Sequence, residues 1–417
     1  MLWEAGLPPH PPTSGNPPPR RSDVAVIGGG YTGLCAARAL RQAGASVVVL
    51  ERERIGWGAS SRNGGFVLPG YKADIEAIIR RLGLPVARRL HDDSIEAIAF
   101  VERLVTEAGI SCDFHRPGYL TLAARPGHLT GLEATHRLLQ REFACHTELL
   151  SRADLKAEIA SDRYHGGLLE PEAAAVQPAV YVRGLADLVA REGVVPVEGA
   201  GVLAIRRAGP AFEIETSLGP VTAGDVLVAT NGYTGRLVPW LARRVVPVGS
   251  FLIGTAPLPE ETRRRLIPRG RLFADTKNLL YYFRLSPDGR MVFGGRAAFV
   301  PTAVEKSREL LRRGMVEVFP ELAAVPVEYA WGGTLGFTLD HLPHAGRQDG
   351  VAYALGYGGH GVALSSWLGD QVGRAMAGGG AWPAIAAAPF PSIPMYFGRP
   401  WFLPAAGAYY ALKDRLG

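Results

Sequence analysis

The feature that most constrains the fold of this chain is a strand–turn–helix–strand unit close to its N-terminus. Residues 23–27 form an apolar strand, and the glycine-rich turn at 28–33 leads from it into a helix that runs to about Gln42. Gly44 ends this helix, and residues 46–51 form a second apolar strand. Two strands joined through one short helix predict a parallel βαβ unit, and therefore a fold of the α/β class.

The turn of this unit has the spacing of a dinucleotide-binding motif. Gly28, Gly30 and Gly33 follow the GxGxxG pattern. The first glycine allows the tight turn, the second lets the backbone approach a pyrophosphate, and the third lets helix and sheet pack closely. Glu51 ends the next strand, where a carboxylate accepts both hydroxyls of an adenosine ribose and disfavours a 2′-phosphate. The alternative is a chance glycine cluster, which the flanking strand and helix argue against.

Composition excludes several other classes. The 52 glycines and 32 prolines follow no collagen-like period, and the net charge of +6 comes from scattered cations, so we expect no nucleic-acid partner. Cys35, Cys112 and Cys145 are far apart, which predicts neither a disulfide framework nor a metal site and favours a cytoplasmic setting. Residues 1–22 are rich in proline and predict an extended tail rather than a signal peptide. No apolar run is long enough to span a membrane.

Two kinds of pattern alternate along the rest of the chain. Residues 225–229 form another buried strand, and residues 351–377 repeat the strand–turn–helix pattern. Residues 245–300, between them, alternate as antiparallel strands with a turn at 287–289. We therefore expect an α/β domain that is discontinuous in sequence and interleaved with a smaller domain, which makes the whole chain α+β.

Two further segments suggest chemistry. Residues 356–361 repeat the GxGxxG spacing, but no acidic residue follows at the right distance, so we expect a helix N-terminus aimed at a buried electron-rich group, or close packing alone. Residues 56–65 are small and polar, apart from Trp57, and include Arg62, which suits the pyrophosphate and ring of a cofactor longer than an adenosine; a solvated surface loop is the alternative. Along residues 281–284, one strand face with Tyr282 and Arg284 is a candidate cavity wall.

Several strings together resemble one family. They are the loop GWGASSRNGG at 56–65, the strand end ATNGY at 229–233, the segments at 331–333 and 338–340, the turn GGHGV at 358–362 and the tail PWFLP at 400–404. The chain resembles the D-amino-acid oxidase/glycine oxidase superfamily of FAD enzymes over its length from about residue 3. Within that superfamily it looks most like the γ-glutamylputrescine oxidase-like group.

The resemblance implies a discontinuous, Rossmann-like FAD-binding domain at 23–85, 150–235 and 326–417, and a substrate-binding domain with a mixed or antiparallel sheet at 86–149 and 236–325. By this match the ADP half of FAD is held by Gly28, Gly30, Gly33 and Glu51. Ala59, Ser60, Arg62, Asn63, Gly64 and Gly65 run along the pyrophosphate and ring. Val202, Ala229 and Thr230 lie at the adenine, and Gly359, His360, Gly361 and Val362 present a helix N-terminus to the N1/C2=O edge of the flavin. Tyr31, Thr32, Arg52, Gly58, Gly333 and Gly358 complete the expected cofactor-binding set.

One position departs from the family pattern and bears on the substrate. Family members that oxidise α-amino acids carry an Arg three residues before the Thr of a Thr-x-Asp motif, and this chain has Leu335 there. The resemblance therefore disfavours an α-amino acid and favours a bulkier amine, or an acid bound by another Arg.

The leading hypothesis is an FAD-dependent oxidase of an amine or N-substituted amino compound, with small-molecule substrate and O₂ as partners. The C–H next to nitrogen delivers hydride to flavin N5, the imine hydrolyses, and reoxidation by O₂ releases H₂O₂. His360, Tyr282 and Arg284 are the candidate catalytic and substrate-contacting residues. Three alternatives stay open: a dehydrogenase that passes electrons to a quinone or carrier protein, a non-enzymatic FAD-binding assembly protein, and an NADPH-fed monooxygenase.

We predict that the FAD is dissociable, because the chain has neither the Cys nor the His through which covalent members of the superfamily attach flavin. Precipitation of the protein by acid or heat is expected to leave the yellow cofactor in the supernatant. Colour that stays on the polypeptide would contradict the prediction.

Overall fold

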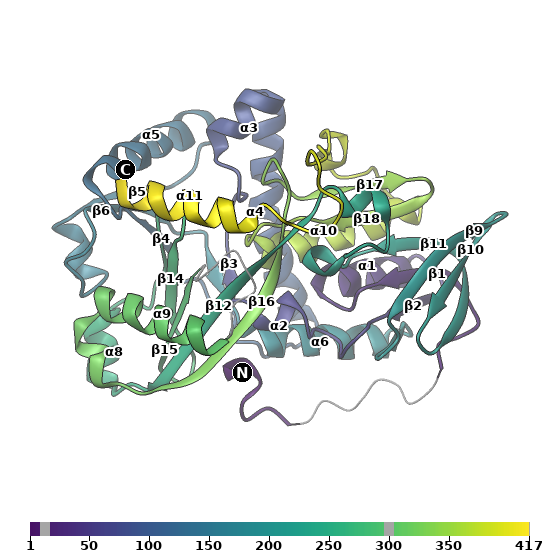
Figure 1. Cartoon of the computed structure of the whole chain (residues 1–417), viewed down its shortest axis with the longest axis horizontal. Coiled ribbons are helices and arrows are strands. Elements are labelled where there is room, and N and C mark those ends of the chain that lie inside the picture. Colours follow the sequence, from purple (N-terminus) through teal and green to yellow (C-terminus); the bar gives the residue numbers. More distant parts are fainter. Residues whose placement is uncertain (9–16, 296–303, 417) are drawn as a thin grey trace.

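The computed structural model describes residues 1–8, 17–295 and 304–416. Two large sheets lie side by side, each with its own helices, and the chain passes between them several times (Figure 1). The mixed α/β architecture confirms the predicted fold class. Within the described residues, no helix combines the length and the apolarity needed to cross a membrane.

The first sheet contains the predicted parallel βαβ unit. Its strand order is β17 (His344–Gln348), β18 (Val351–Leu355), β11 (Gly219–Val228), β1 (Arg21–Ile27), β2 (Val47–Leu50) and β8 (Val195–Val197). All neighbouring pairs from β18 to β8 are parallel, and β17 is antiparallel to β18. A hairpin of β9 (Val202–Ala208) and β10 (Ala211–Thr216) continues from β11. The central strands are almost wholly buried, as expected for a parallel sheet covered on both faces.

Helices cover this sheet and bury its apolar residues. The main ones are α1 (Tyr31–Gln42), α4 (Leu84–Glu107), α6 (Pro178–Arg191) and α10 (Gly361–Met376). Helices α1 and α10 lie against each other (Figure 1). A Cβ atom at Gly369 would overlap the carbonyl oxygen of Thr32, and one at Gly373 would lie 2.6 Å from that of Ala36. Glycine at both positions therefore lets the two helix backbones touch.

The second sheet has eight strands in the order β16 (Val327–Phe337), β12 (Val246–Pro257), β15 (Arg290–Gly295), β14 (Tyr281–Leu285), β13 (Leu272–Asp275), β4 (Tyr119–Leu122), β6 (Gly166–Glu170) and β5 (Glu148–Ser151). Every neighbouring pair is antiparallel except β13 with β4. The helices α8 (Glu260–Leu266) and α9 (Val304–Val318) flank it, with α5 (Pro126–Phe143) and α11 (Leu403–Leu416) at its other side (Figure 1). Phe273, Phe283 and Phe293 stack across adjacent strands in its core.

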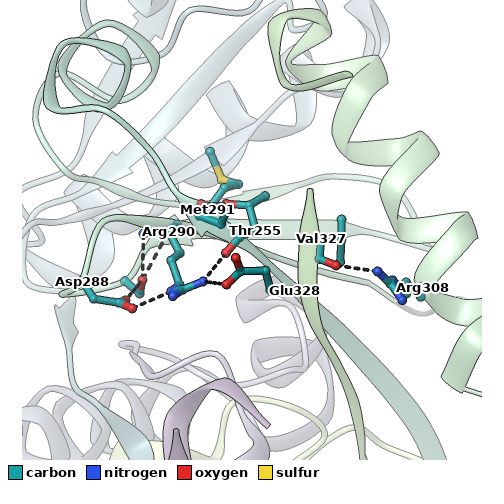
Figure 2. Close-up of polar contacts among 9 residues, drawn as sticks. Thr255, Asp288, Arg290, Met291, Arg308, Val327 and Glu328 are labelled. Carbon is teal, nitrogen blue, oxygen red and sulfur yellow. Dashed lines mark hydrogen bonds and ion pairs between the residues drawn. The ribbon is translucent and has the colours of Figure 1, made fainter. Parts of the chain in front are cut away.

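Arg290 joins three strands of the second sheet through its side chain (Figure 2). Its guanidinium donates to the carbonyl of Thr255 on β12 and pairs with the carboxylates of Asp288 and of Glu328 on β16. Met291 follows Arg290 on β15, and its N–H donates to the Thr255 hydroxyl at 3.0 Å. Helix α9 is joined to β16 by the hydrogen bond from Arg308 to the carbonyl of Val327.

The structure differs from the predicted domain ranges at several elements, among them helix α11, which lies beside the second sheet although its residues fall in the FAD-binding range (Figure 1). Strands β6 and β16 fall within the ranges assigned to the FAD-binding domain, yet both pair in the second sheet. Helix α4 falls in the range assigned to the substrate-binding domain, yet it packs on α10 and contributes to the first core. For β16 the reason is its pairing with β12 along ten residues of each strand. Hydrophobic pattern alone does not reveal such long-range pairing.

The predicted extended tail is wrong for the first residues of the chain. Leu2–Glu4 form a short 3₁₀ helix, and Trp3 is only 2% exposed. Trp3 packs edge-on against Trp331, with 6.2 Å between ring centroids, in a cluster with Leu2 and Leu252. The proline content of the segment predicts that it lacks regular structure. Leu2 and Trp3 precede the first proline, and they pack into the core although the rest of the segment is rich in proline.

We predict that Gly369→Ala destabilises the protein, because the new methyl group meets the backbone of α1 and not a movable side chain. Overpacking of this kind costs about 1–3 kcal/mol of unfolding free energy. Gly131→Ala is the matched control: Gly131 lies inside helix α5 with open space around it, so alanine there is neutral or stabilising. Thermal and urea unfolding of both variants measure the difference, and equal stability of the two would refute the packing argument.

Candidate active site

The glycine turn after β1 has the close contacts that a dinucleotide cradle requires. Gly28 has φ +108°, and a Cβ atom there would lie 2.9 Å from the carbonyl oxygen of Ala229. A Cβ atom at Gly33 would overlap the carbonyl oxygen of Gly28. At Gly30, a Cβ atom would lie 2.8 Å from the hydroxyl oxygen of Ser60. Gly28 and Gly33 therefore exclude a side chain, and a side chain at Gly30 would displace the Ser60 hydroxyl that accepts a hydrogen bond at the start of α1.

Glu51 lies at the end of β2, beside this turn. Its two carboxylate oxygens accept hydrogen bonds from the backbone N–H groups of Gly29, at 2.8 Å, and Glu53, at 2.9 Å. Burial raises the pKa of this carboxyl above its usual value, although both hydrogen bonds oppose the shift. Each oxygen keeps acceptor capacity for a ribose hydroxyl.

A cavity of about 760 Å³ runs from this turn along the carboxyl ends of the first sheet. Its volume lies within the range of roughly 300–1,000 Å³ found for small-molecule sites. The predicted residues that line it are Gly28, Gly30, Tyr31, Thr32, Glu51, Arg52, Gly58, Ala59, Ser60, Asn63, Val202, Ala229, Thr230, Gly359, Gly361 and Val362. The cavity therefore joins the two glycine turns and the polar loop that the sequence singled out.

The polar loop at 56–65 is held by donors from distant parts of the chain. The indole N–H of Trp3 donates to the carbonyl of Asn63 at 2.8 Å, and that of Trp331 donates to the carbonyl of Arg62 at 3.0 Å. The Asn63 side chain bonds within the loop, donating to the carbonyls of Ala59 and Ser60 and accepting from the Gly65 N–H. These contacts fix the backbone of the loop beside both cavities.

Arg62 is the one cation of this loop, and its guanidinium is committed to the protein. It donates to the carbonyls of Trp57, at 2.7 Å, and Gly332, at 3.2 Å, and lies 4.6 Å from the centre of the Trp57 ring. Ser60, from the short helix α2 (Ala59–Arg62), accepts a hydrogen bond from the Tyr31 N–H at the start of α1. The loop and the first glycine turn therefore form one connected surface.

The second glycine turn places the N-terminus of α10 at the far end of the cavity. Gly356, Gly358 and Gly359 all have positive φ, of +92°, +60° and +101°. The side-chain oxygen of Asn231 accepts a hydrogen bond from the Gly356 N–H at 3.0 Å, which ties this turn to the end of β11. The predicted helix N-terminus is thus present, with His360 as its capping residue.

A second, smaller cavity of about 120 Å³ adjoins the first. Ala59, Asn63, Leu335, Gly359 and Val362 line both cavities, so the two share a wall at the start of α10. The predicted residues Arg62, Gly64, Tyr282, Gly333, Gly358 and His360 line the smaller cavity. Its other walls are mainly apolar, from Phe66, Leu68, Tyr119, Leu252, Ala274 and Leu280. Within it, the hydroxyls of Ser250 and Tyr282 are 3.1 Å apart.

Arg284 corrects one prediction for this cavity. Tyr282 and Arg284 share a face of β14, as expected, but Arg284 is 1% exposed and lines neither cavity. Its guanidinium donates to the carbonyls of Gly65 and Val176, each at 3.1 Å, and burial lowers its pKa to about 10. Arg284 therefore supports the loop from behind and does not contact a substrate. Gly33 and Gly65 also act through packing, because neither lines a cavity.

Several residues that line the long cavity were not predicted from the sequence. Strand β9 contributes Leu203 and Arg206, and the segment after β11 contributes Tyr233 and Arg236. The hydroxyl of Tyr233 accepts a hydrogen bond from the Thr334 N–H at 3.1 Å. The ATNGY string was a signal for Tyr233, whereas nothing in the local pattern marks β9.

No group of three or more His, Cys, Asp or Glu side chains within the described residues could hold a metal ion. Asp340 and His344 pair with each other, and Arg81 joins them at 3.1 Å from the Asp340 carboxylate. This buried cluster connects the segment before β17 to helix α3 (Ile75–Leu82) and faces neither cavity.

The two cavities fit a long two-part cofactor with a reacting ring at the shared wall. The glycine cradle and Glu51 suit an adenosine diphosphate, and the start of α10 offers N–H groups and a positive dipole end to an electron-rich ring. A parallel sheet with this turn at the carboxyl ends of its strands defines the class of dinucleotide-binding folds.

Comparison with known proteins identifies the family. The family described as DAO, FAD dependent oxidoreductase, matches residues 23–375. Gamma-glutamylputrescine oxidoreductase of Escherichia coli (strain K12) is 36% identical over 400 residues, which cover 95% of this chain and 93% of that protein. Probable oxidoreductase OrdL of Rhizobium meliloti (strain 1021) is 35% identical over 373 residues, 88% and 86% of the two chains. The chain belongs to the DAO family of FAD-dependent oxidoreductases; it is an enzyme and its cofactor is FAD.

Solved structures agree on the fold. Glycine oxidase from Geobacillus kaustophilus has a TM-score of 0.75 at 21% identity, over 90% of this chain and 99% of that one. At this identity the likeness concerns the fold alone. It confirms the predicted arrangement of an FAD-binding fold built from two multi-stranded sheets.

We predict that Trp3→Phe weakens FAD binding about fivefold, because the loss of one buried hydrogen bond to the Asn63 carbonyl costs about 1 kcal/mol. Trp401→Phe is the control, since Trp401 is 64% exposed and lies away from the loop. The FAD dissociation constant is measured by flavin fluorescence on the apoprotein, with thermal unfolding of the apoprotein as a check on folding. Equal FAD affinity for the two variants would show that Trp3 does not position the loop.

Proposed function

We propose that the protein is an oxidase that uses FAD to oxidise the C–N bond of an amine or N-substituted amino compound. The observation that carries the proposal is the small, mainly apolar cavity that shares a wall with the long cavity at the start of α10. The reacting carbon of a substrate in the small cavity would lie next to the ring of the cofactor, at the wall that the two cavities share. The name of the relative gamma-glutamylputrescine oxidoreductase supports an amino compound as substrate.

When bound, FAD would supply a two-electron acceptor for a hydride from the substrate, and O₂ would be the final acceptor of both electrons. The substrate loses this hydride from carbon and a proton from nitrogen, so its C–N single bond becomes an imine. Water then adds to the imine and releases a carbonyl compound and an amine or ammonia. O₂ gains two electrons and two protons and becomes H₂O₂.

The side chains of the small cavity contribute mainly placement and exclusion of water. The walls from Phe66, Leu252 and Leu280 favour a neutral amine, which is the form that releases hydride. We assign to the Ser250–Tyr282 hydroxyl pair the orientation of the polar end of the substrate. We assign to His360, at the start of α10, the electrostatics of the flavin ring in preference to proton transfer. This chemistry needs no strong general base when the amine binds neutral.

For the cofactor we propose the non-covalent binding set given by the sequence. Gly28, Gly30 and Glu51 hold the ADP half, and the loop with Ser60 and Asn63 follows the pyrophosphate. The long cavity also takes in Arg206 and Arg236, two cations that suit the phosphate or adenine end.

We predict that anaerobic mixing of the holoenzyme with an amine panel bleaches the visible flavin absorbance for at least one member of the panel. Admitting air is then expected to restore the colour, with consumption of O₂ and formation of H₂O₂ in equal amounts. The panel contains simple amines, polyamines, N-methyl amino acids and amino-acid conjugates.

The outcomes separate the alternatives. Bleaching that O₂ reverses only slowly, while a quinone analogue reverses it quickly, would replace the oxidase by a dehydrogenase. Reduction of the flavin by NADPH would indicate a monooxygenase. A panel that leaves the flavin oxidised throughout would refute an amine-oxidising function and favour an FAD-binding assembly protein.

A further inference from the structure

We propose that Asp414, on the C-terminal helix α11, is a positioning residue for the small cavity. It acts through the turn at 276–280, whose last residue, Leu280, lines that cavity. The inference rests on the proposed function and deepens it, because it names the residue through which α11 affects the binding of the amine.

The turn at 276–280 reaches the small cavity through its neighbours as well. It joins β13 to β14, and Ala274 before it and Tyr282 after it also line the cavity. The pairing of β13 with β14 ends at these two residues, so the strands by themselves do not fix the backbone of the turn. The position of Leu280 therefore depends on the other groups that hold the turn.

Asp414 supplies the acceptors for the apex of the turn. Its Oδ1 atom accepts hydrogen bonds from the backbone N–H of Asn278 at 2.9 Å and from the side-chain amide of Asn278 at 2.7 Å. Its Oδ2 atom accepts from the Leu279 N–H at 2.8 Å. Burial by itself raises the pKa of this carboxyl, but these hydrogen bonds prevail and hold the pKa below its usual value. Asp414 is therefore ionised at neutral pH, and its three hydrogen bonds are of the stronger, charge-assisted kind.

A second carboxylate holds the turn on either side of the apex and cannot replace Asp414. The Oδ1 atom of Asp275 accepts hydrogen bonds from the N–H groups of Lys277, at 3.2 Å, and Tyr281, at 3.1 Å. Its Oδ2 atom lies 3.1 Å from the Lys277 ammonium. Because Asp275 is committed to these groups, loss of the Asp414 carboxylate would leave the two N–H groups that precede Leu280 without this acceptor.

Helix α11 is itself joined to the protein at Asp414. The Arg125 guanidinium, at the start of α5, donates to the Asp414 carbonyl. The same end of α5 holds the beginning of the turn, because the Ala124 N–H donates to the Thr276 hydroxyl at 3.1 Å and Nδ1 of His128 lies 2.6 Å from that hydroxyl. Helices α5 and α11 and the turn therefore form one hydrogen-bonded unit.

An apolar cluster joins α11 to the wall that the two cavities share. Leu403, at the start of α11, is buried together with Val246 and Val248 of β12. Leu279 of the turn and Leu335 of β16 pack against this cluster, and Leu335 lines both cavities. A shift of the turn relative to α11 therefore changes the small cavity at the place where a substrate would meet the cofactor ring.

The test compares the wild-type holoenzyme with Asp414→Asn, Asp414→Glu and the control Lys413→Gln. Asparagine keeps the shape of the side chain but removes its charge, and glutamate keeps the charge on a longer side chain. Lys413→Gln removes a charge from the exposed neighbour on the same helix. The measurements are hydrogen exchange of the backbone amides at 276–281, quenching of the flavin fluorescence by acrylamide, and the dissociation constant of FAD. The probe amine is n-hexylamine, whose dissociation constant comes from the perturbation of the flavin spectrum, with kcat and KM where it is oxidised.

We expect Asp414→Asn to speed the exchange of the Asn278 and Leu279 amides about tenfold and to weaken the binding of n-hexylamine about fivefold, because the charge-assisted hydrogen bonds at the apex are lost. Acrylamide quenching is expected to rise as the turn loosens. The loss appears in KM, while kcat and the FAD dissociation constant stay nearly unchanged, since Asp414 lines neither cavity. Asp414→Glu is expected to keep part of the wild-type behaviour, and Lys413→Gln all of it.

Unchanged exchange in Asp414→Asn would overturn the inference, and so would unchanged binding of n-hexylamine when the wild type binds it. A parallel loss of affinity for FAD and for the amine would overturn it too, because Asp414 would then only stabilise the fold. If the wild type neither binds nor oxidises n-hexylamine, exchange and acrylamide quenching decide the positioning role, and the missing oxidation counts against the proposed function alone.

Discussion

The whole active site depends on backbone touching backbone around helix α1. Its N-terminal turn contacts the end of β11 through Gly28, and its body contacts α10 through Gly369, with no side chain between them in either place. These contacts bring the end of β1 and the starts of two helices to one cavity. Because protein interiors are close-packed and do not yield to an added methyl group, this geometry is rigid. These glycines fix the position of α1 relative to β11 and α10, and they do not make the backbone flexible here.

Buried donors give the polar loop a similar rigidity by a different means. Trp3, Trp331 and Arg284 come from three separate elements, and each donates to a carbonyl of residues 62–65. An unpaired buried carbonyl costs free energy, so these hydrogen bonds strongly select one backbone conformation. The second sheet, which supplies Trp331 and Arg284, therefore supports the cofactor site as well as enclosing the small cavity.

The sequence predicts the parts of this site that obey local rules. The turn at Gly28, the carboxylate at Glu51 and the helix start at Gly361 follow from spacing within short segments, and the structure has all three. Arg284 and Trp3 could not be placed from sequence, because their partners are 219 and 60 residues away in the chain. Strands β6 and β16 pair in the second sheet, outside the domain ranges expected for them, and strand pairing across the chain leaves no local pattern from which this could be predicted.

The contact between Thr32 and Gly369 has a consequence for the order of events in the cell. The first βαβ unit is synthesised before α10, so α1 lacks its backbone contact with Gly369 until the chain has reached α10. The long cavity is lined by residues of both helices, so it is complete only once α10 has packed on α1. A ligand that binds this cavity therefore stabilises the folded state as a whole, because it binds the folded chain and not the unfolded one.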